Sequence, residues 1–311
     1  MTPELSSPPA LRIFRFNDVD EFRQSVRAVD VWFTPLARRI SASQTILTLP
    51  GCDINLVTSF PRVMDVQLKP GCTAVGFAMT PRSALRMNGI DADMPFLAIG
   101  RGGGTYTAVE RTALQFTSVM FTPEVLGRGW PEPGQDFLVF EMTADAQQKL
   151  RGLVLEVMSF ASTSPDELAT PGVSDGIKES MLAAIDHAFA TRVRVAPLGS
   201  PPGTRFIDIV RRAEEIVSAN LGHPVYSEEL ACEIGVSVRT LHSAILRHRG
   251  MSLHRYLRLK RLWLVRQRLR QGDVSVKACA LAHGFWHLGE FSKSYRRHFG
   301  EAPSETAAKA R

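Results

Sequence analysis

Cysteine is scarce in this sequence of 311 residues, and long apolar runs are absent. The four cysteines form no CxxC pair, so reduced thiols are expected, although paired redox cysteines stay an open alternative. They are Cys52, Cys72, Cys232 and Cys279, and the last two lie among alanines where a core position is expected. No run of about eighteen apolar residues occurs, which predicts no transmembrane helix. The start, MTPELSSPPALRIF, lacks the regions of a secretory signal and is typical of a loose arm, so we expect a cytoplasmic protein without membrane binding.

Motifs of common catalytic sites are also missing. Residues 1–186 contain no histidine, which excludes a histidine metal site and a Ser-His-Asp triad there, and GxSxG is absent. The tract IGRGGGTYTAVE, residues 99–110, lacks the GKS or GKT ending of a phosphate-binding loop. It is therefore predicted to be a mobile loop between strands. We expect neither a metal ion nor a cofactor.

The charges are unevenly distributed along the chain. Residues 204–311 hold 19 Lys and Arg against 10 Asp and Glu, a net charge of +9. The other 203 residues hold 18 against 21, a net charge of −3, and seven of the eight histidines follow residue 204. This asymmetry predicts two domains with different partners, and the basic one is a candidate for binding phosphate backbones or anionic lipid.

The first two hundred residues show two kinds of periodicity. Between residues 44 and 122, short segments rich in β-branched and aromatic residues predict an antiparallel sandwich or small barrel. These segments are TILTL, INLVTSF, RVMDVQL, TAVGFAM, PFLAIG and LQFTSVMF. Residues 143–161 and 174–194 show helical spacing, with Asp145 and Ser174 as expected N-caps. One helical stripe contains Leu150, Leu153, Val154 and Val157.

Proline and glycine mark the boundary between the two regions. Residues 195–204, VAPLGSPPGT, contain three prolines and two glycines, which end a helix and loosen the chain. We therefore assign residues 1–195 to a first domain, residues 196–204 to a linker, and residues 205–311 to a helical second domain.

A helix-turn-helix pattern occupies residues 227–250, SEELACEIGVSVRTLHSAILRHRG. Ser227 and Ser237 are expected to cap two short helices, and Gly235 supplies the tight turn between them. The second helix has an apolar face (Leu241, Ala244 and Ile245) and a polar face (Arg239, His242 and Ser243). A second helix with a polar outer face is typical of a motif that reads DNA.

The pattern recurs in residues 283–300, HGFWHLGEFSKSYRRHFG, where Gly284 takes the turn position after a first helix at 276–282. An apolar stripe contains Leu288, Phe291, Tyr295 and Phe299, and a separate edge contains Trp286, Gly289, Glu290, Lys293 and Arg297. A helix on a membrane surface would place Trp286 with the other rings. We therefore expect a second reader helix.

Between the two patterns, residues 252–272 predict a helix with a leucine-rich core stripe and many basic residues. About eighteen helical residues span roughly 27 Å, which suits a rigid spacer between two reader helices about one DNA turn apart. Upstream, Arg211 and Arg212 beside Glu214 and Glu215 predict a solvated helix face.

The C-terminal hundred residues resemble the DNA-binding domain of the AraC/XylS family of transcription regulators. The resemblance is carried by EELACEIGVSVRTLHSAILRHRG, YLRLKRLWLVRQRL and ACALAHGFWHLGEFSKSYRRHFGEAPSE. The last segment is the most specific, with its Gly-Phe, Phe-Ser-basic, aromatic-basic-basic, Phe-Gly and Pro-Ser steps. The resemblance covers about a third of the chain. It implies an all-α domain with two helix-turn-helix units joined by a linker helix.

The resemblance also implies which residues touch DNA. The base-reading positions fall on Arg239, His242 and Ser243 in the first reader helix, and on Gly289, Ser292 and Lys293 in the second. Further contacts are expected from Thr240, Arg247, Trp286, His287 and Arg297. The sequence departs from the family pattern at Gly289, Lys293, Tyr295 and the pair Thr306-Ala307. We therefore expect Arg239, which can address guanine, to carry most of the specificity, and the second helix to clamp phosphates.

The first two hundred residues resemble the family's sensor domains in outline only. The predicted fold class is therefore α+β: a β-rich, barrel- or sandwich-like sensor and dimerisation domain with helices, followed by an all-α DNA-binding domain. The resemblance implies an activator whose partners are double-stranded DNA, RNA polymerase, a small-molecule effector and a second copy of the chain. The alternative is an enzyme tethered to DNA by the same domain, such as a DNA-repair methyltransferase, although Cys52 and Cys72 lack neighbouring ligand cysteines.

Overall fold

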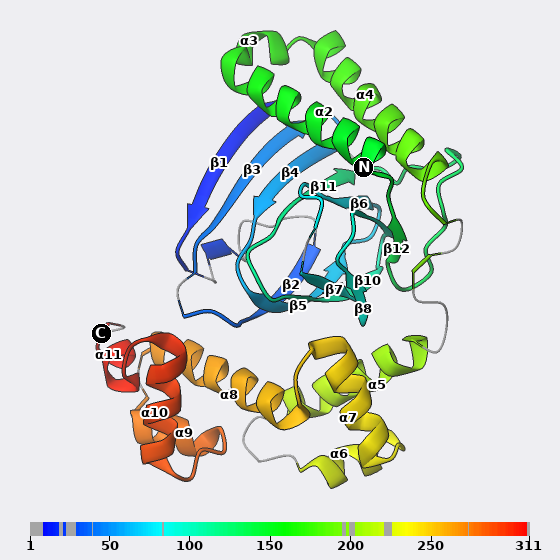
Figure 1. Cartoon of the computed structure of the whole chain (residues 1–311). Helices are drawn as coiled ribbons and strands as arrows, with labels where there is room; N and C mark the ends of the chain where they lie inside the picture. Colours follow the sequence, from blue (N-terminus) through cyan, green and yellow to red (C-terminus); the bar gives the residue numbers. More distant parts are fainter. Residues whose placement is uncertain are drawn as a thin grey trace, which may run out of the picture. The chain divides into compact units, whose positions relative to one another are not determined.

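A computed structural model describes most of the chain, as two compact units. The described residues are 9–18, 21–22, 29–38, 40–82, 84–194, 197–198, 203–220, 226–272 and 274–309. One unit contains residues 1–33 and 40–200, and the other contains residues 34–39 and 201–311. The first is β-rich with helices and the second is all-α, which confirms the predicted α+β class (Figure 1). The start of the predicted arm and most of the predicted linker, residues 196–204, lie outside the described residues.

Two antiparallel sheets build the first unit. The strands are β1 (Ala10–Phe16), β2 (Val29–Pro35), β3 (Ala42–Leu49), β4 (Cys52–Thr58), β5 (Arg62–Leu68), β6 (Thr73–Ala78), β7 (Leu85–Met87), β8 (Ile90–Ala92), β9 (Phe96–Arg101), β10 (Thr105–Glu110), β11 (Gln115–Phe121) and β12 (Leu138–Glu141). One sheet has seven strands in the order β1-β3-β4-β11-β6-β9-β12, and the other has five in the order β2-β5-β10-β7-β8. The six strands predicted from the sequence are β3, β4, β5, β6, β9 and β11.

The glycine-rich tract at residues 99–110 is not a mobile loop, and that prediction is wrong. Strand β9 ends at Arg101 and β10 begins at Thr105, so only three residues connect them. Strand β10 pairs with β5 in register from Thr105 opposite Gln67 to Glu110 opposite Arg62. The tract contains Thr, Tyr and Val after its glycines, and these residue types favour a half-buried strand once a partner strand is present.

Three helices, α2 (Ala144–Thr163), α3 (Pro165–Leu168) and α4 (Pro171–Ala190), cover one face of the seven-stranded sheet (Figure 1). Both predicted N-caps are wrong. Helix α2 is capped by Thr143, whose hydroxyl accepts the Ala146 N–H at 3.3 Å, and Asp145 lies in its first turn. The residue before α4 is Thr170, while Ser174 is buried and donates to the Leu168 carbonyl at 2.6 Å.

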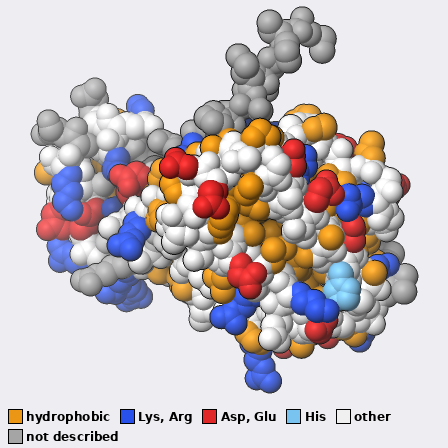
Figure 2. All heavy atoms as spheres, turned by 90° about the horizontal axis from the view of Figure 1, so that it is seen from above, with side chains coloured by type: hydrophobic (Ala, Val, Ile, Leu, Met, Phe, Trp, Pro, Cys, Tyr) orange, Lys and Arg blue, Asp and Glu red, His pale blue; other side chains and the backbone are white. Residues whose placement is uncertain are grey.

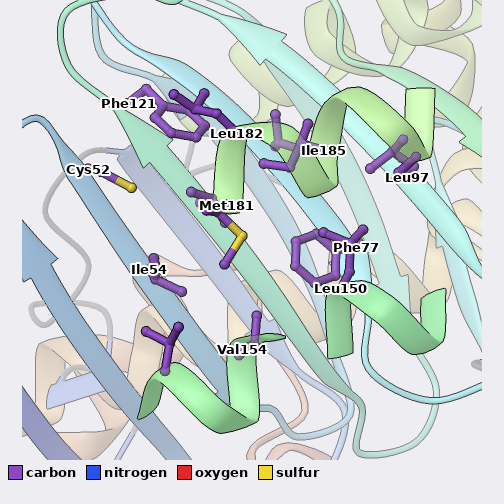
Figure 3. Packing of buried hydrophobic residues seen from close by; sticks show 14 of the residues in the cluster. Cys52, Ile54, Phe77, Leu97, Phe121, Leu150, Val154, Met181, Leu182 and Ile185 are labelled. Carbon is purple, nitrogen blue, oxygen red and sulfur yellow. The ribbon is translucent and has the colours of Figure 1, made fainter. Parts of the chain in front are cut away.

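Apolar side chains from α2 and α4 interlock with those of the sheet. Figure 3 shows Leu150 of α2 beside Phe77 of β6, and Met181 of α4 near Ile54 of β4. These four side chains are at most 1% exposed. Cys52 belongs to the same cluster, and burial, with a smaller contribution from the charge of Asp53, raises its pKa to about 12. Its thiol is therefore a packing group at neutral pH.

The second unit is a set of seven described helices (Figure 1). They are α5 (Gly203–Ala219), α6 (Ser227–Ile234), α7 (Val238–Arg249), α8 (Leu253–Arg270), α9 (Val276–Ala282), α10 (Leu288–Phe299) and α11 (Pro303–Ala308). None of the helices in the described part of the chain is long and apolar enough to cross a membrane.

Stability of the first unit should depend on the helix–sheet core. Leu150 is fully buried, and its replacement by alanine should lower the free energy of unfolding by about 2–5 kcal/mol, because a cavity is left behind. The matched control is Leu155→Ala on the same helix, where the side chain is 43% exposed, so less apolar area leaves the core and the loss should be clearly smaller. Chemical denaturation of the full chain measures both, and equal losses would contradict the assigned core.

Candidate nucleic-acid interface

The first helix-turn-helix unit is formed by α6 and α7. Gly235 ends α6 with a φ of +77°, in the left-handed region that glycine adopts without steric penalty. The Ser237 hydroxyl accepts the Thr240 N–H at 3.0 Å and caps α7, as predicted. Ser227 is the first residue of α6, and Tyr226 is its N-cap, so that predicted cap is off by one position. The apolar residues Leu230, Ala231, Ile234, Leu241, Ala244 and Ile245 are all buried.

The second helix-turn-helix unit is formed by α9 and α10. Ser275 caps α9 by accepting the Ala278 N–H at 3.1 Å, and Gly284 makes the turn with a φ of +76°. Phe291 and Tyr295 of α10 are buried, as the apolar stripe predicts. Cys279 is buried on α9, whereas Cys232 of α6 is exposed, so the core prediction is confirmed for the first and wrong for the second.

Helix α8 connects the two helix-turn-helix units. Its 18 residues correspond to roughly 27 Å of helix. The predicted core stripe is buried: Leu253, Leu257, Leu262, Val265 and Leu269. At its far end Arg266 forms an ion pair with Glu301 at 2.8 Å, and Arg258 donates to Ser294 of α10. The second helix-turn-helix unit is thus attached to α8 by polar contacts as well as by core packing.

All eleven predicted contact residues lie on α7, on α10 or on the two residues before α10. Ten of the eleven have polar or aromatic side chains, and eight of these ten lie on the two helices themselves. The exposed ones are Arg239, His242, Ser243, Trp286, His287, Gly289, Ser292, Lys293 and Arg297. Thr240 and Arg247 are half-buried, and the Thr240 hydroxyl is hydrogen-bonded to Ser237 in the helix cap at 2.8 Å. Lys293 forms an exposed ion pair with Glu290 at 3.2 Å.

One surface residue of α7 was missed by the sequence prediction. Leu246 is 55% exposed and follows His242 and Ser243 by four and three positions, so it lies on the same face as Arg239. The spacing is visible in the sequence, but the polar face was defined from Arg239, His242 and Ser243 alone. An exposed leucine on a reading face can contact a thymine methyl group.

A buried ion pair anchors α5 to α7, and the prediction that Glu214 lies on a solvated face is wrong. Arg249 is fully buried and donates to Glu214, which also accepts from the Tyr256 hydroxyl. Burial alone would raise the pKa of Glu214, but the charges of Arg249 and Lys260 and the hydrogen bond from Tyr256 lower it overall. Glu214 therefore remains a carboxylate at neutral pH.

The two departures near the C-terminus compensate each other. The Tyr295 hydroxyl donates to Thr306 at 2.8 Å, and Thr306 donates to Glu301 at 2.7 Å. Burial raises the pKa of the Tyr295 phenol, so it keeps the proton that it donates. A phenylalanine at position 295 would leave Thr306 without this donor.

Comparison with known proteins identifies this domain. Residues 230–309 match the family described as "Helix-turn-helix domain". The chain is 34% identical over 98 residues to "XylDLEGF operon transcriptional activator 1" of Pseudomonas putida, which covers 30% of each protein. It is 41% identical over 83 residues to "HTH-type transcriptional activator RhaS" of Pectobacterium atrosepticum, covering 25% of this chain and 30% of the relative.

The C-terminal domain belongs to the AraC/XylS family. Among solved structures, a probable AraC family transcriptional regulator from Rhodopseudomonas palustris is 39% identical, covers 33% of this chain and 98% of that chain, and has a TM-score of 0.31. The chain spans less than a third of the length of the first two curated relatives. For the AraC/XylS domain, the family and the two helix-turn-helix units agree with the resemblance found in the sequence.

The Tyr295–Thr306 contact should contribute to the stability of the AraC/XylS domain. Tyr295→Phe should lower the free energy of unfolding by about 0.5–1.5 kcal/mol, because it removes one buried hydrogen bond. Thr306→Val should lower it by more, because it also removes the hydrogen bond from Thr306 to Glu301. The double variant should lose less than the sum of the two, since the second change removes nothing further from that contact. Urea unfolding of the four proteins measures the coupling. Strictly additive losses would show that the contact contributes nothing.

Proposed function

We propose that the chain is a sequence-specific DNA-binding transcription regulator that acts as an activator. The observation that carries this proposal is the pair of helix-turn-helix units, each of which exposes its second helix, on a common linker helix α8. Residues 204–311, which contain them, have a net charge of +9. Positive charge of this size favours binding to the phosphate backbone, and exposed second helices suit the major groove.

In this proposal the two reader helices have different tasks. Arg239 is exposed on the outer face of α7 and has the fork of donors that matches guanine O6 and N7. Lys293 of α10 is a point charge, and it already shares an ion pair with Glu290. Gly289 presents no side chain to a base. Helix α7 would therefore supply most of the base recognition, and α10 would position the domain on phosphates.

The first unit is proposed to sense a small-molecule effector and to pair two copies of the chain. Effector binding and pairing would together control contact with RNA polymerase. Figure 2 shows hydrophobic side chains among charged ones on the face of α2–α4. On α2, Leu155 is 43% exposed and Leu153 and Phe160 are half-buried. These apolar groups support the dimer assignment. An effector must favour one arrangement of the pair over the other, because equal binding shifts no equilibrium.

Regulation is proposed in preference to the alternative of an enzyme tethered to DNA. The two curated relatives described above are named as transcriptional activators. Within the described residues, no group of three His, Cys, Asp or Glu side chains could hold a metal ion. Cys52, the first cysteine of the β-rich unit, is a buried thiol and not a nucleophile exposed to substrate.

DNA binding by the full chain should depend steeply on salt. Each phosphate neutralised by Lys or Arg releases counterions, so the slope of log K against log[salt] should be about −0.9 per phosphate. Fluorescence anisotropy with a labelled duplex between low and physiological salt measures the slope. A flat plot would contradict the electrostatic part of the proposal.

The two reader helices should respond differently to truncation. Arg239→Ala should weaken specific binding by about 1–3 kcal/mol and relax the preference at one base pair. Lys293→Ala should weaken specific and non-specific duplexes equally and reduce the salt slope by about one. Competition binding with a selected site and its single-base variants measures both effects. An equal loss of sequence preference in the two variants would show that α10 reads bases as α7 does.

A further inference from the structure

A cavity of about 130 Å³ lies between the two sheets of the first unit. Its walls come from the face of the seven-stranded sheet that points away from α2–α4, and from the facing side of the five-stranded sheet. Engineered apolar cavities of about 150 Å³ in other proteins bind benzene. The volume therefore suits a molecule with a single ring.

The lining indicates what kind of ring would fit. Three methionines from different strands, Met64, Met87 and Met120, face the cavity together with the rings of Phe96 and Tyr106. Thioether sulfur and aromatic edges pack favourably against a planar aromatic ring. Methionine also adapts its shape to a guest more readily than branched side chains do.

Two arginines in the wall each have a buried donor without a partner in the described part of the chain, Arg12 at Nε and Arg62 at Nη1, and Arg62 lies among aromatic rings. Arg62 of β5 is 2% exposed, and its Nε and Nη2 atoms donate to Glu110 at 3.2 and 3.0 Å. Its guanidinium lies over the rings of Phe22, Phe33 and Phe60, at 5.2, 4.6 and 5.3 Å from their centroids. The buried Nη1 atom has no hydrogen-bond partner among the described residues. An acceptor on a bound molecule would satisfy this donor, whose desolvation is otherwise uncompensated.

The net charge of the residues that line the cavity indicates whether a bound molecule can be charged. By formal charge, the wall contains two basic residues, Arg12 and Arg62, and two acidic residues, Asp53 and Glu110. They sum to zero, and Arg62 is already neutralised by the paired carboxylate of Glu110. An anionic guest would therefore give the wall and guest together a net negative charge, which is strongly unfavourable at low dielectric.

We propose that this cavity binds an uncharged, single-ring aromatic molecule with an acceptor atom that receives a hydrogen bond from Nη1 of Arg62. The inference rests on the proposed sensing role of the first unit only in regarding that molecule as an effector. The binding itself is a property of the cavity.

The test uses three probes of similar size with the full chain: benzamide, benzoate and benzene. Benzamide should bind with one-to-one stoichiometry in calorimetry, and benzoate should bind at least about tenfold more weakly because of its charge. Benzoate binding as tightly as benzamide would overturn the uncharged class. Failure of benzamide to saturate would overturn the site.

Two variants locate the binding. An added Cβ at Gly76, which lines the cavity, meets only the Thr117 carbonyl at 3.9 Å, so Gly76→Leu should fill the cavity, keep the fold and abolish benzamide binding. The control is Gly152→Leu on α2, where nothing lies within 4 Å of an added Cβ and binding should be unchanged. Thermal unfolding confirms that both variants are folded. Unchanged binding in a folded Gly76→Leu protein would overturn the proposed location.

The role of Arg62 is tested by Arg62→Lys, which keeps the charge beside Glu110 and loses the fork of donors. Benzamide should bind roughly ten- to a hundredfold more weakly, as the loss of one charged hydrogen bond predicts, and benzene should be unaffected. Equal changes for both probes would show that Arg62 only shapes the cavity. Duplex binding by the same proteins is measured separately, so a failure of this inference with DNA binding intact leaves the proposed regulator untouched.

Discussion

The central strands of the seven-stranded sheet are covered on both faces, and the two faces meet different surroundings. Successive side chains of a strand point to opposite faces, so each strand contributes alternate residues to each side. On β4, Ile54 packs against the helices, whereas Asp53 and Asn55 line the cavity. On β11, Val119 and Phe121 pack against the helices, and Ser118 lines the cavity with Met120. A shift of register by one residue would exchange the two sets and place polar groups in the helix–sheet core. The closed core and the partly polar cavity are therefore fixed by the same register.

The second unit depends on one long helix in a similar way. Helix α8 gives its leucine stripe to the core and two arginines to the second helix-turn-helix unit, since Arg258 contacts α10 and Arg266 pairs with Glu301 just after α10. At the other end Tyr256 meets the buried pair of Arg249 and Glu214. Buried ion pairs of this kind add little net stability, but losing one partner leaves an uncompensated charge. They hold the two reader helices to one spacer in defined orientations.

Sequence periodicity predicted the elements whose patterns are local. Helices α7 and α10 and the glycine turns at Gly235 and Gly284 follow from residue spacing, because capping and turn geometry act within a few residues. Strand β10 was not predicted, since its Thr and Tyr residues follow a run of glycines and form a strand by pairing with the distant strands β5 and β7. The burial of Glu214 also depends on a distant partner, Arg249, which is 35 residues away in sequence. Predicted DNA contacts rest on the family resemblance, whereas the cavity requires two sheets to face each other.

Charge is treated in opposite ways in the interior and at the proposed DNA surface. Inside both units arginines are matched with carboxylates, as in Arg62 with Glu110 and Arg249 with Glu214. On the reader helices Arg239, Lys293 and Arg297 are exposed, and of these Lys293 has a weak surface pair with Glu290. An exposed ion pair is readily exchanged for a phosphate, whereas a buried one is not, because breaking it strands a charge at low dielectric. The positive surface can therefore respond to DNA while the internal pairs keep each unit rigid. A neutral guest in the cavity would leave the buried pair of Arg62 and Glu110 intact, since it changes the packing between the sheets and brings no charge of its own.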